Sequence, residues 1–298
     1  MRTLLLSLLI LSGCSSKSTD SSAMENPPFD EACAEQTPIK TVLWGDLHAH
    51  SAWSFDAGAY GSNLTSEDAY AYAKGASVTL PDATGAITRT VTIDRPLDFL
   101  GMTEHGEFLG EISICTDERW EGYNSETCQA WRNVEESNGA FDFGVLMAAA
   151  EPTRFVDVCG NDGADCLTAA RERWLEIQRI ANEADDRTAA CSFTSFVAYE
   201  YTNTRDISNL HRNVLFRNEH VPDMPITHFE APSPVKLWKG LDEACTGECD
   251  VLVLPHNSNL SNGQLFTPDY EGLDEVEIAG LRARMEPVAE IFQHKGSS

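Results

Sequence analysis

Alternating apolar and polar stretches divide the chain into predicted strands and helices. Short apolar runs predict buried β-strands over 42–49, 96–103, 192–199, 209–216, 250–255 and 287–292. Longer stretches with Ser or Thr starts, acidic first turns or Gly stops predict helices over 65–75, 168–185, 233–244 and 276–285. A β-rich segment lies between them at 78–93. Because strands and helices roughly alternate, the pattern predicts an α/β layer with parallel strand pairing.

One long span interrupts this alternation. Residues 107–190 are irregular, contain aromatic residues and cysteines, and have one clear helix at 168–185. A span of this length between two strands is typical of an insertion or a cap. The sequence therefore predicts one domain over 39–298 with a disulfide-containing insertion at about 107–190.

The N-terminal residues have the features of an export signal. A cationic start and the apolar run Leu4 to Leu11 match a secretory signal over residues 1–13, too short to span a bilayer. Leu11-Ser-Gly-Cys14 resembles the bacterial lipobox, so Cys14 is expected to carry a lipid, and Ser15 after it favours the outer membrane. The Ser-rich residues 14–38 read as a flexible tether. An unmodified Cys14 in a periplasmic or extracellular protein is the alternative.

The remaining cysteines favour disulfide bonds. Of nine cysteines, eight remain when Cys14 is set aside, and an even number in an exported chain indicates disulfides more than thiolate metal sites. Short spacings favour three disulfide pairs, and the two remaining cysteines make a fourth. Sequence alone leaves the connectivity open. The pairs are Cys115 with Cys128, Cys159 with Cys166, Cys245 with Cys249, and Cys33 with Cys191.

The charge of the chain limits its partners. Forty-seven acidic against 21 basic residues give a formal net charge of −26. Such a surface repels nucleic-acid phosphates and anionic lipid headgroups, so no nucleic-acid partner is expected and membrane contact is expected only through the lipid. An anionic small-molecule substrate would need a locally positive site, which bound metal ions supply.

Metal-competent side chains recur where the predicted strands end. His48 and His50 alternate on the first strand and so share a face, and Asp56 follows after a short polar turn. His105, Glu200 and His256 each stand at or just past the end of a later strand, where α/β barrels place their active sites. An isolated His-x-His is about as often a pair of core histidines as a metal ligand. The repetition at successive strand ends favours the metal interpretation.

The chemistry of these side chains points to hydrolysis. Imidazole and carboxylate ligands together suit zinc, manganese or iron, and a site rich in both can hold more than one ion. Paired ions acidify a bound water and stabilise the attacking and leaving oxygens. The sequence has no Gly-x-Ser-x-Gly elbow, Walker loop or dinucleotide fingerprint.

The order and spacing of these motifs resemble the polymerase and histidinol phosphatase (PHP) superfamily. The motifs are His48-Ala-His50 with Asp56, Thr103-Glu-His105, Val-Ala-Tyr-Glu200, Leu-His211-Arg and Val-Leu-Pro-His256. Leu43-Trp-Gly-Asp-Leu-His-Ala-His-Ser and Leu-Pro-His-Asn-Ser-Asn resemble more closely an uncharacterised exported branch with a domain of unknown function. The resemblance covers about residues 41–298.

The resemblance implies a distorted (β/α)7 barrel that holds up to three divalent ions and hydrolyses phosphoesters with a metal-bound hydroxide. It assigns the ligands in three sets: His48, His50 and Glu200; Glu200, His211 and His256; Asp56 and His105. Arg212 and Arg205 are the candidates for gripping a phosphate, although each also fits an ordinary surface or salt-bridging arginine. Glu104 is a candidate acid or base, or a salt-bridge partner.

One departure from the superfamily's motifs limits how far its function can be assigned to this chain. The superfamily closes its site with a late Asp-x-His motif, and residues 287–298 contain none. The sequence is therefore expected to be a fragment with a barrel incomplete at its C-terminus, and to bind metal weakly or lack activity in this form. Two other functions stay open: an amidohydrolase-type barrel, which would place a bridging Lys where Glu200 stands, and a non-catalytic envelope lipoprotein or binding module with a relic metal site.

Overall fold

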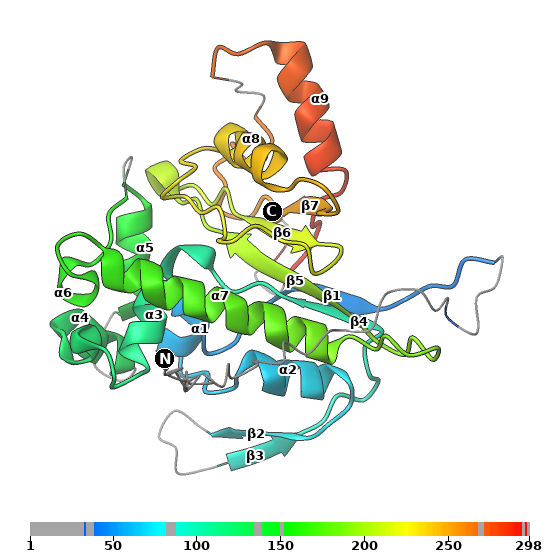
Figure 1. The fold of residues 1–298 in the computed structure, drawn as a ribbon, viewed down its shortest axis with the longest axis horizontal. Helices are drawn as coiled ribbons and strands as arrows, with labels where there is room; N and C mark the ends of the chain where they lie inside the picture. The colour runs from blue at the N-terminus through cyan, green and yellow to red at the C-terminus, as the bar shows by residue number, and fades with distance from the viewer. Residues whose placement is uncertain are drawn as a thin grey trace, which may run out of the picture.

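The protein has a mixed α/β fold built on a curled, half-barrel sheet (Figure 1). The computed structural model describes residues 33, 39–81, 88–133, 139–149, 152–267, 271–293 and 296. The expected signal over 1–13, the lipidated Cys14 and most of the tether lie outside these residues. The predicted α/β class is confirmed.

Five strands form the sheet in the order β1-β4-β5-β6-β7. They are β1 (Gly45–Ala49), β4 (Phe99–Met102), β5 (Thr194–Tyr201), β6 (Arg212–Phe216) and β7 (Val251–Pro255). β1, β4 and β5 pair in parallel, whereas β6 pairs antiparallel with both β5 and β7. The prediction of uniformly parallel pairing is therefore wrong at β6. The link from β5 to β6 is short and carries no crossover helix, which permits only an antiparallel return.

Two predicted strand segments differ in the structure. Val42, Leu43 and Trp44 precede β1 as extended chain and are 69%, 59% and 59% exposed, so they are not the buried start of a strand. Residues 287–292 are irregular; the backbone N–H of Glu290 donates to the carbonyl of Pro255 at 3.0 Å, alongside the end of β7. In both cases an apolar run is present, but among the described residues it makes only isolated backbone bonds, such as Asp98 N–H to Trp44 O at 2.7 Å, and no strand ladder.

The four predicted helices are confirmed. They are α2 (Ser66–Ala73), α7 (Ala164–Ala184), α8 (Pro234–Ala244) and α9 (Glu275–Met285). Thr65 and Asp68 form a capping box at α2, and Ser233 caps α8. The β-rich segment is a separate two-stranded antiparallel unit of β2 (Val78–Pro81) and β3 (Thr88–Val91).

The span at 107–190 is largely helical, not irregular. Besides α7 it contains α3 (Leu109–Cys115), α4 (Glu126–Arg132), α5 (Gly139–Met147), α6 (Val156–Cys159) and the 3-10 turn η2 (Glu121–Asn124), with η1 (Gly106–Phe108) at its start. These helices are too short for a 3.6-residue pattern to emerge from the sequence. Gly110 lets α3 approach α7 closely, because a Cβ there would lie 2.1 Å from the carbonyl oxygen of Cys166.

All four expected disulfides are present. They are Cys33–Cys191, Cys115–Cys128, Cys159–Cys166 and Cys245–Cys249. Two of them lie within the helical span, so the predicted disulfide-containing insertion is confirmed in this respect.

Alternation along β5 separates packing residues from site residues. Val197, Tyr199 and Tyr201 are buried in the main core, where the ring of Trp174 on α7 lies 5.8 Å from that of Tyr199. Because successive strand residues point to opposite faces, Glu200 is directed away from this helical layer. The core therefore fixes β5 while its intervening residues face the inside of the curl.

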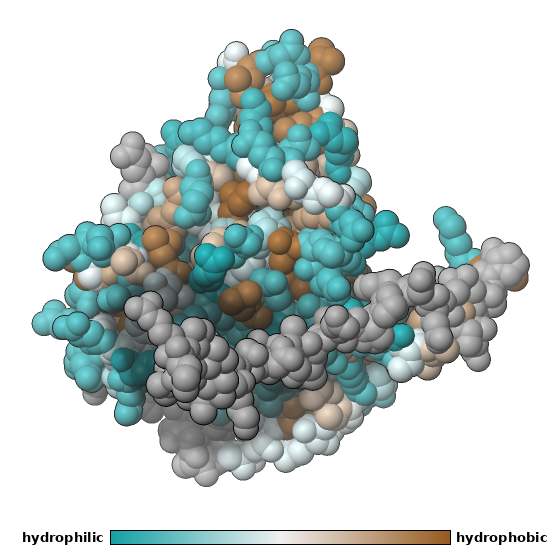
Figure 2. All heavy atoms as spheres, viewed as in Figure 1, coloured by the Kyte–Doolittle hydropathy of each residue, from teal (hydrophilic) through white to brown (hydrophobic). Residues whose placement is uncertain are grey.

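Hydrophilic side chains cover most of the face shown in Figure 2, with hydrophobic residues in separate patches and at the projecting end by α9. Val276 at the start of α9 is 83% exposed. Within the described part of the chain, every helix is too short or too polar to cross a membrane.

Candidate metal centre

Strand polarity brings the predicted ligands to one edge of the sheet. His48 and His50 lie at the end of β1, His105 follows β4, Glu200 is near the end of β5, and His256 follows β7 directly. His211 immediately precedes β6. Because β6 runs antiparallel to its neighbours, its start meets the ends of the other strands. The reversal of β6 therefore explains how a residue at the beginning of a strand joins the cluster.

Glu200 lies at the centre of the cluster and its side chain is 1% exposed. Its Oε2 atom lies 2.8 Å from His50 Nε2 and 3.4 Å from His48 Nε2. The same oxygen lies 3.5 Å from His105 Nδ1, and Oε1 lies 3.1 Å from His211 Nδ1. One carboxylate thus contacts four imidazoles: two from the end of β1, one from the loop after β4 and one from the residue before β6.

Asp56 forms a second, more accessible acidic corner. It lies in the first turn of the short helix α1 (Phe55–Ala59), and its side chain is 33% exposed. Its Oδ1 is 3.1 Å from His50 Nδ1, and its Oδ2 is 3.5 Å from His105 Nε2. The cluster is therefore buried around Glu200 and open toward Asp56.

Three groups of side chains at this edge of the sheet have the geometry of metal sites. In each group the ligand atoms lie within 4.8 Å of one another: His48, His50 and Glu200; His50, Asp56 and His105; His105, Glu200 and His211. Ligands about 2.1 Å from a tetrahedral ion stand roughly 3.4 Å apart, which is close to the distances around Glu200. His50 Nε2 and Glu200 Oε2 are buried and form no hydrogen bond of acceptable geometry with the described residues. Both observations fit a bound cation.

His256 departs from the expected ligand set. Its ring lies 5.3 Å from that of His211 and 5.4 Å from that of His48, but it belongs to none of the three groups. Its Nδ1 bonds the carbonyl of Asn257 at 2.7 Å, and its Nε2 faces Gln293 Nε2 at 3.1 Å. His105 takes the expected place of His256 beside Glu200 and His211.

Several contact residues were missed from the sequence. Thr202 Oγ1 lies 2.5 Å from His105 Nδ1, and Thr204 Oγ1 lies 3.2 Å from His211 Nε2. Glu290 Oε1 lies 3.1 Å from His48 Nδ1. The two threonines follow β5 directly, which is a positional signal. No such positional signal marks Glu290, because residues 287–292 resemble a strand.

Comparison with known proteins places the chain in a family. Residues 37–298 match the family described as "Protein of unknown function (DUF3604)". The chain belongs to this family. No curated protein and no solved structure matches it. Every metal-competent residue described above lies within the DUF3604 match, so the function has to be argued from the site itself.

The charges of the DUF3604 site are tightly coupled. Burial opposes ionisation of Glu200, but the nearby His105 and His48 hold the pKa of Glu200 well below its usual range. Burial likewise opposes the charged form of Asp56, and His50 and His105 lower its pKa well below normal. Burial lowers the pKa of His211 to about 3. The two carboxylates are therefore ionised, and His211 is neutral, as metal ligands must be.

Zinc affinity is expected to rise with pH from about 6 to about 9. Burial alone lowers the pKa of His48, but the carboxylates of Glu200 and Glu290 raise it to about 9. Below pH 9, zinc must displace the proton of His48. Apparent zinc affinity therefore rises by up to about tenfold per pH unit for each proton displaced. Competition titrations at several pH values measure this slope. A flat affinity between about pH 6 and 8 would contradict it.

Glu104 and Arg212, two of the proposed catalytic residues, have structural roles in the DUF3604 domain. Glu104 is buried and accepts hydrogen bonds from the Ser51 backbone N–H at 2.9 Å and from the hydroxyls of Ser51 and Ser66 at 2.5 and 2.9 Å. These bonds tie the end of β1 to the start of α2. Arg212 is 1% exposed and its Nε donates to Glu286 at 2.6 Å, while its two amino groups bond the carbonyls of Leu210 and Leu265. These contacts hold both side chains inside the fold.

Arg205 remains accessible. Its side chain is 55% exposed and lies 3.7 Å from Asp206, and it follows the Thr204 that contacts His211. Of the two arginines that the sequence indicates for anion contact, Arg205 is therefore the one whose guanidinium faces solvent.

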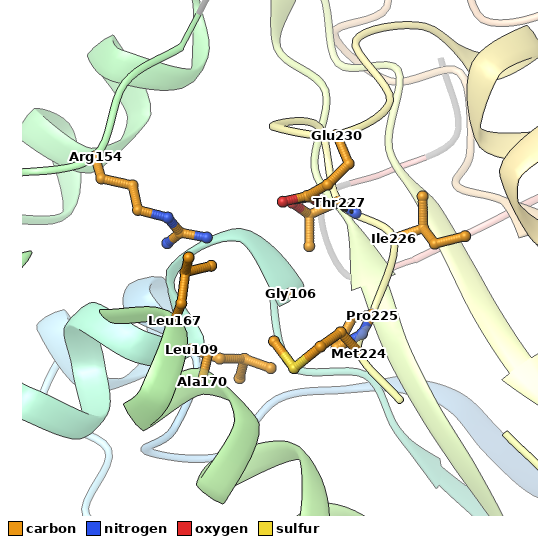
Figure 3. Close-up of a pocket in the computed structure, with 10 residues that line it drawn as sticks. All are labelled: Gly106, Leu109, Arg154, Leu167, Ala170, Met224, Pro225, Ile226, Thr227 and Glu230. Atoms are coloured by element: carbon orange, nitrogen blue, oxygen red, sulfur yellow. Dashed lines mark hydrogen bonds between the residues drawn. The ribbon is translucent and has the colours of Figure 1, made fainter. Parts of the chain in front are cut away.

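A separate cavity lies behind the turn that follows His105 (Figure 3). Its volume is about 270 Å³, and Gly106, Leu109, Met224 and Ile226 are among its lining residues. The Arg154 side chain extends over one side of it, with Nη1 held by Glu111 at 2.9 Å. The cavity is mainly apolar and includes none of the metal-competent side chains.

Proposed function

We propose that the protein is a metal-dependent hydrolase of the PHP type, with its ligands at the carboxyl edge of a distorted (β/α)7 barrel. It acts on a phosphoester or a related small-molecule ester and uses up to three zinc, manganese or iron ions. The observation that carries the proposal is the buried Glu200 carboxylate, which meets His48, His50, His105 and His211 within 3.5 Å. A convergence of perturbed carboxylates and imidazoles of this kind is typical of functional sites.

Each part of the chain has a defined task in this proposal. Bound divalent ions supply Lewis acidity and an acidified water. Glu200 bridges the histidine groups and holds them in one orientation. Asp56, the more exposed carboxylate, marks the side from which substrate and water enter. Thr202 and Thr204 fix the rings of His105 and His211 by hydrogen bonds.

An anionic substrate fits the charge distribution of this proposal. The chain carries a net charge of −26, so a phosphoester is repelled by most of the surface. Divalent ions at the edge of the sheet where the histidines gather would create a local positive site. Arg205, exposed beside Thr204, would add one further positive charge there.

Export is part of the proposal. Four disulfides form where the environment is oxidising, which supports secretion of the domain. We propose that Cys14 carries the lipid and anchors the protein at the outer membrane.

Hydrolysis assays test the proposal. The metal-loaded protein is expected to hydrolyse generic phosphomonoesters or phosphodiesters with at least one of zinc, manganese or iron. His48→Ala, which removes a ligand at the cluster, should reduce the rate to background. Folded, metal-loaded protein that hydrolyses no phosphoester or carboxylic ester faster than His48→Ala would contradict the enzyme assignment and favour a binding module.

A further inference from the structure

Both ring nitrogens of His48 face a carboxylate, and one of the two carboxylates, Glu290, lies outside the three ligand groups. Nε2 lies 3.4 Å from Glu200 Oε2, and Nδ1 lies 3.1 Å from Glu290 Oε1. We propose that Glu290 belongs to the metal centre as a positioning residue, which holds the His48 ring so that Nε2 faces the ion. This inference rests on the proposed metal-dependent function and adds a residue to it.

The Glu290 carboxylate is held in place from its other side. Its Oε2 accepts the backbone N–H of Asn257 at 3.0 Å and Gln293 Nε2 at 3.2 Å. The Glu290 backbone N–H donates to Pro255 O at 3.0 Å. These bonds fix the side chain beside the end of β7 and leave Oε1 directed at His48.

The arrangement matches the way proteins orient metal-bound histidine. A ligating imidazole that binds an ion through one nitrogen donates the N–H of the other to a carboxylate, a carbonyl or a hydroxyl. Two neighbouring rings already have such partners: Thr202 for His105 and Thr204 for His211. Glu290 completes the pattern for His48. Only 12% of its side chain is exposed, so little water competes for this contact.

Glutamine at this position cannot satisfy all of these contacts. Both oxygens of the carboxylate accept hydrogen bonds, whereas an amide accepts at only one of its two ends. In Glu290→Gln the NH2 group must face either the His48 Nδ1–H or the donors of Asn257 and Gln293. An isosteric change therefore removes either the orienting contact with His48 or the bonds that hold the side chain in place, with little change in volume.

Zinc binding tests the assignment in the full chain. Glu290→Gln and Glu290→Ala are expected to bind zinc roughly 10- to 100-fold more weakly than wild type in competition with a chromophoric chelator. In the zinc-loaded wild-type protein, the His48 Nδ1–H should give a nitrogen-15 NMR signal typical of a strong hydrogen bond, and the signal should be lost or shifted in both variants. Glu277→Gln, an exposed glutamate on α9, is the matched control and should bind as wild type does.

The outcomes separate this inference from the proposed function. Wild-type zinc affinity and an unchanged His48 signal in both Glu290 variants, with weakened binding in His48→Ala, would overturn the role of Glu290 and leave the metal centre standing. A wild-type chain that binds none of zinc, manganese and iron would overturn both. Thermal unfolding of the metal-free variants close to that of wild type shows that the affinity loss is not a loss of fold.

Discussion

Replacing Glu200 with glutamine is expected to empty the two ligand groups that share its carboxylate. Two of the three groups that fit an ion share this carboxylate, and it contacts four histidines. Glutamine has nearly the same size but no negative charge, and it cannot bridge two cations with two anionic oxygens. The affinity loss should exceed the roughly 10- to 100-fold that removal of an outer hydrogen-bond partner costs.

Elemental analysis and hydrolysis assays on Glu200→Gln measure this effect. Glu118→Gln, which changes an exposed glutamate in the same way, should retain wild-type metal content. Circular dichroism of the metal-free variants separates loss of ligand from loss of fold. If Glu200→Gln bound as much metal as wild type, with the same affinity, Glu200 would not be the bridging ligand.

Replacing Arg212 with methionine is expected to cost at most about 3–5 kcal/mol of unfolding free energy, because the buried Glu286 carboxylate loses one of its two arginine partners and keeps Arg282 at 3.1 Å. Arg212 and Glu286 are both almost fully buried, and their Nε and Oε1 atoms are 2.6 Å apart. The same Glu286 oxygen accepts Trp238 Nε1 at 2.9 Å, so the pair joins β6 to α8 and to the end of α9. The guanidinium also satisfies the carbonyl of Leu265, and methionine cannot.

Urea unfolding of Arg212→Met measures this loss. Arg217→Met is the matched control just past the other end of β6, where an 80% exposed arginine pairs with Asp250 at 3.3 Å. That exposed pair should contribute only about 0–1 kcal/mol. Metal content should be unchanged in both variants, because Arg212 does not reach the cluster. A loss below about 1 kcal/mol for Arg212→Met, or an activity loss with normal stability, would favour the substrate-gripping role instead.

The candidate site was more predictable from the sequence than the fold around it. His48, His50, His105 and Glu200 were found because buried strands end at polar, metal-competent residues, and the structure brings these side chains together. Helix termini were predicted equally well where a local cap is present, as at Thr65. These signals are local, since they depend on a few neighbouring residues.

Features that depend on distant partners were not predictable. The apolar residues 42–44 resemble a buried strand, but no other part of the described chain covers them, and they are exposed. Glu290 lies 242 positions from the histidine that it contacts, and its apolar neighbours gave no sign of a site. Arg212 follows His211 in the sequence, which suggested a substrate contact, yet strand alternation turns it to the opposite face and toward Glu286.

Metal content of the purified wild-type protein is the most direct test of this account. Elemental analysis after dialysis against trace zinc, manganese and iron should find at least one ion per chain, and up to three if every group is filled. The same analysis of His48→Ala should find fewer. If wild-type protein that is folded and has its disulfides formed retained no more metal than His48→Ala, the clustered histidines would be architectural and the metal centre would be wrong.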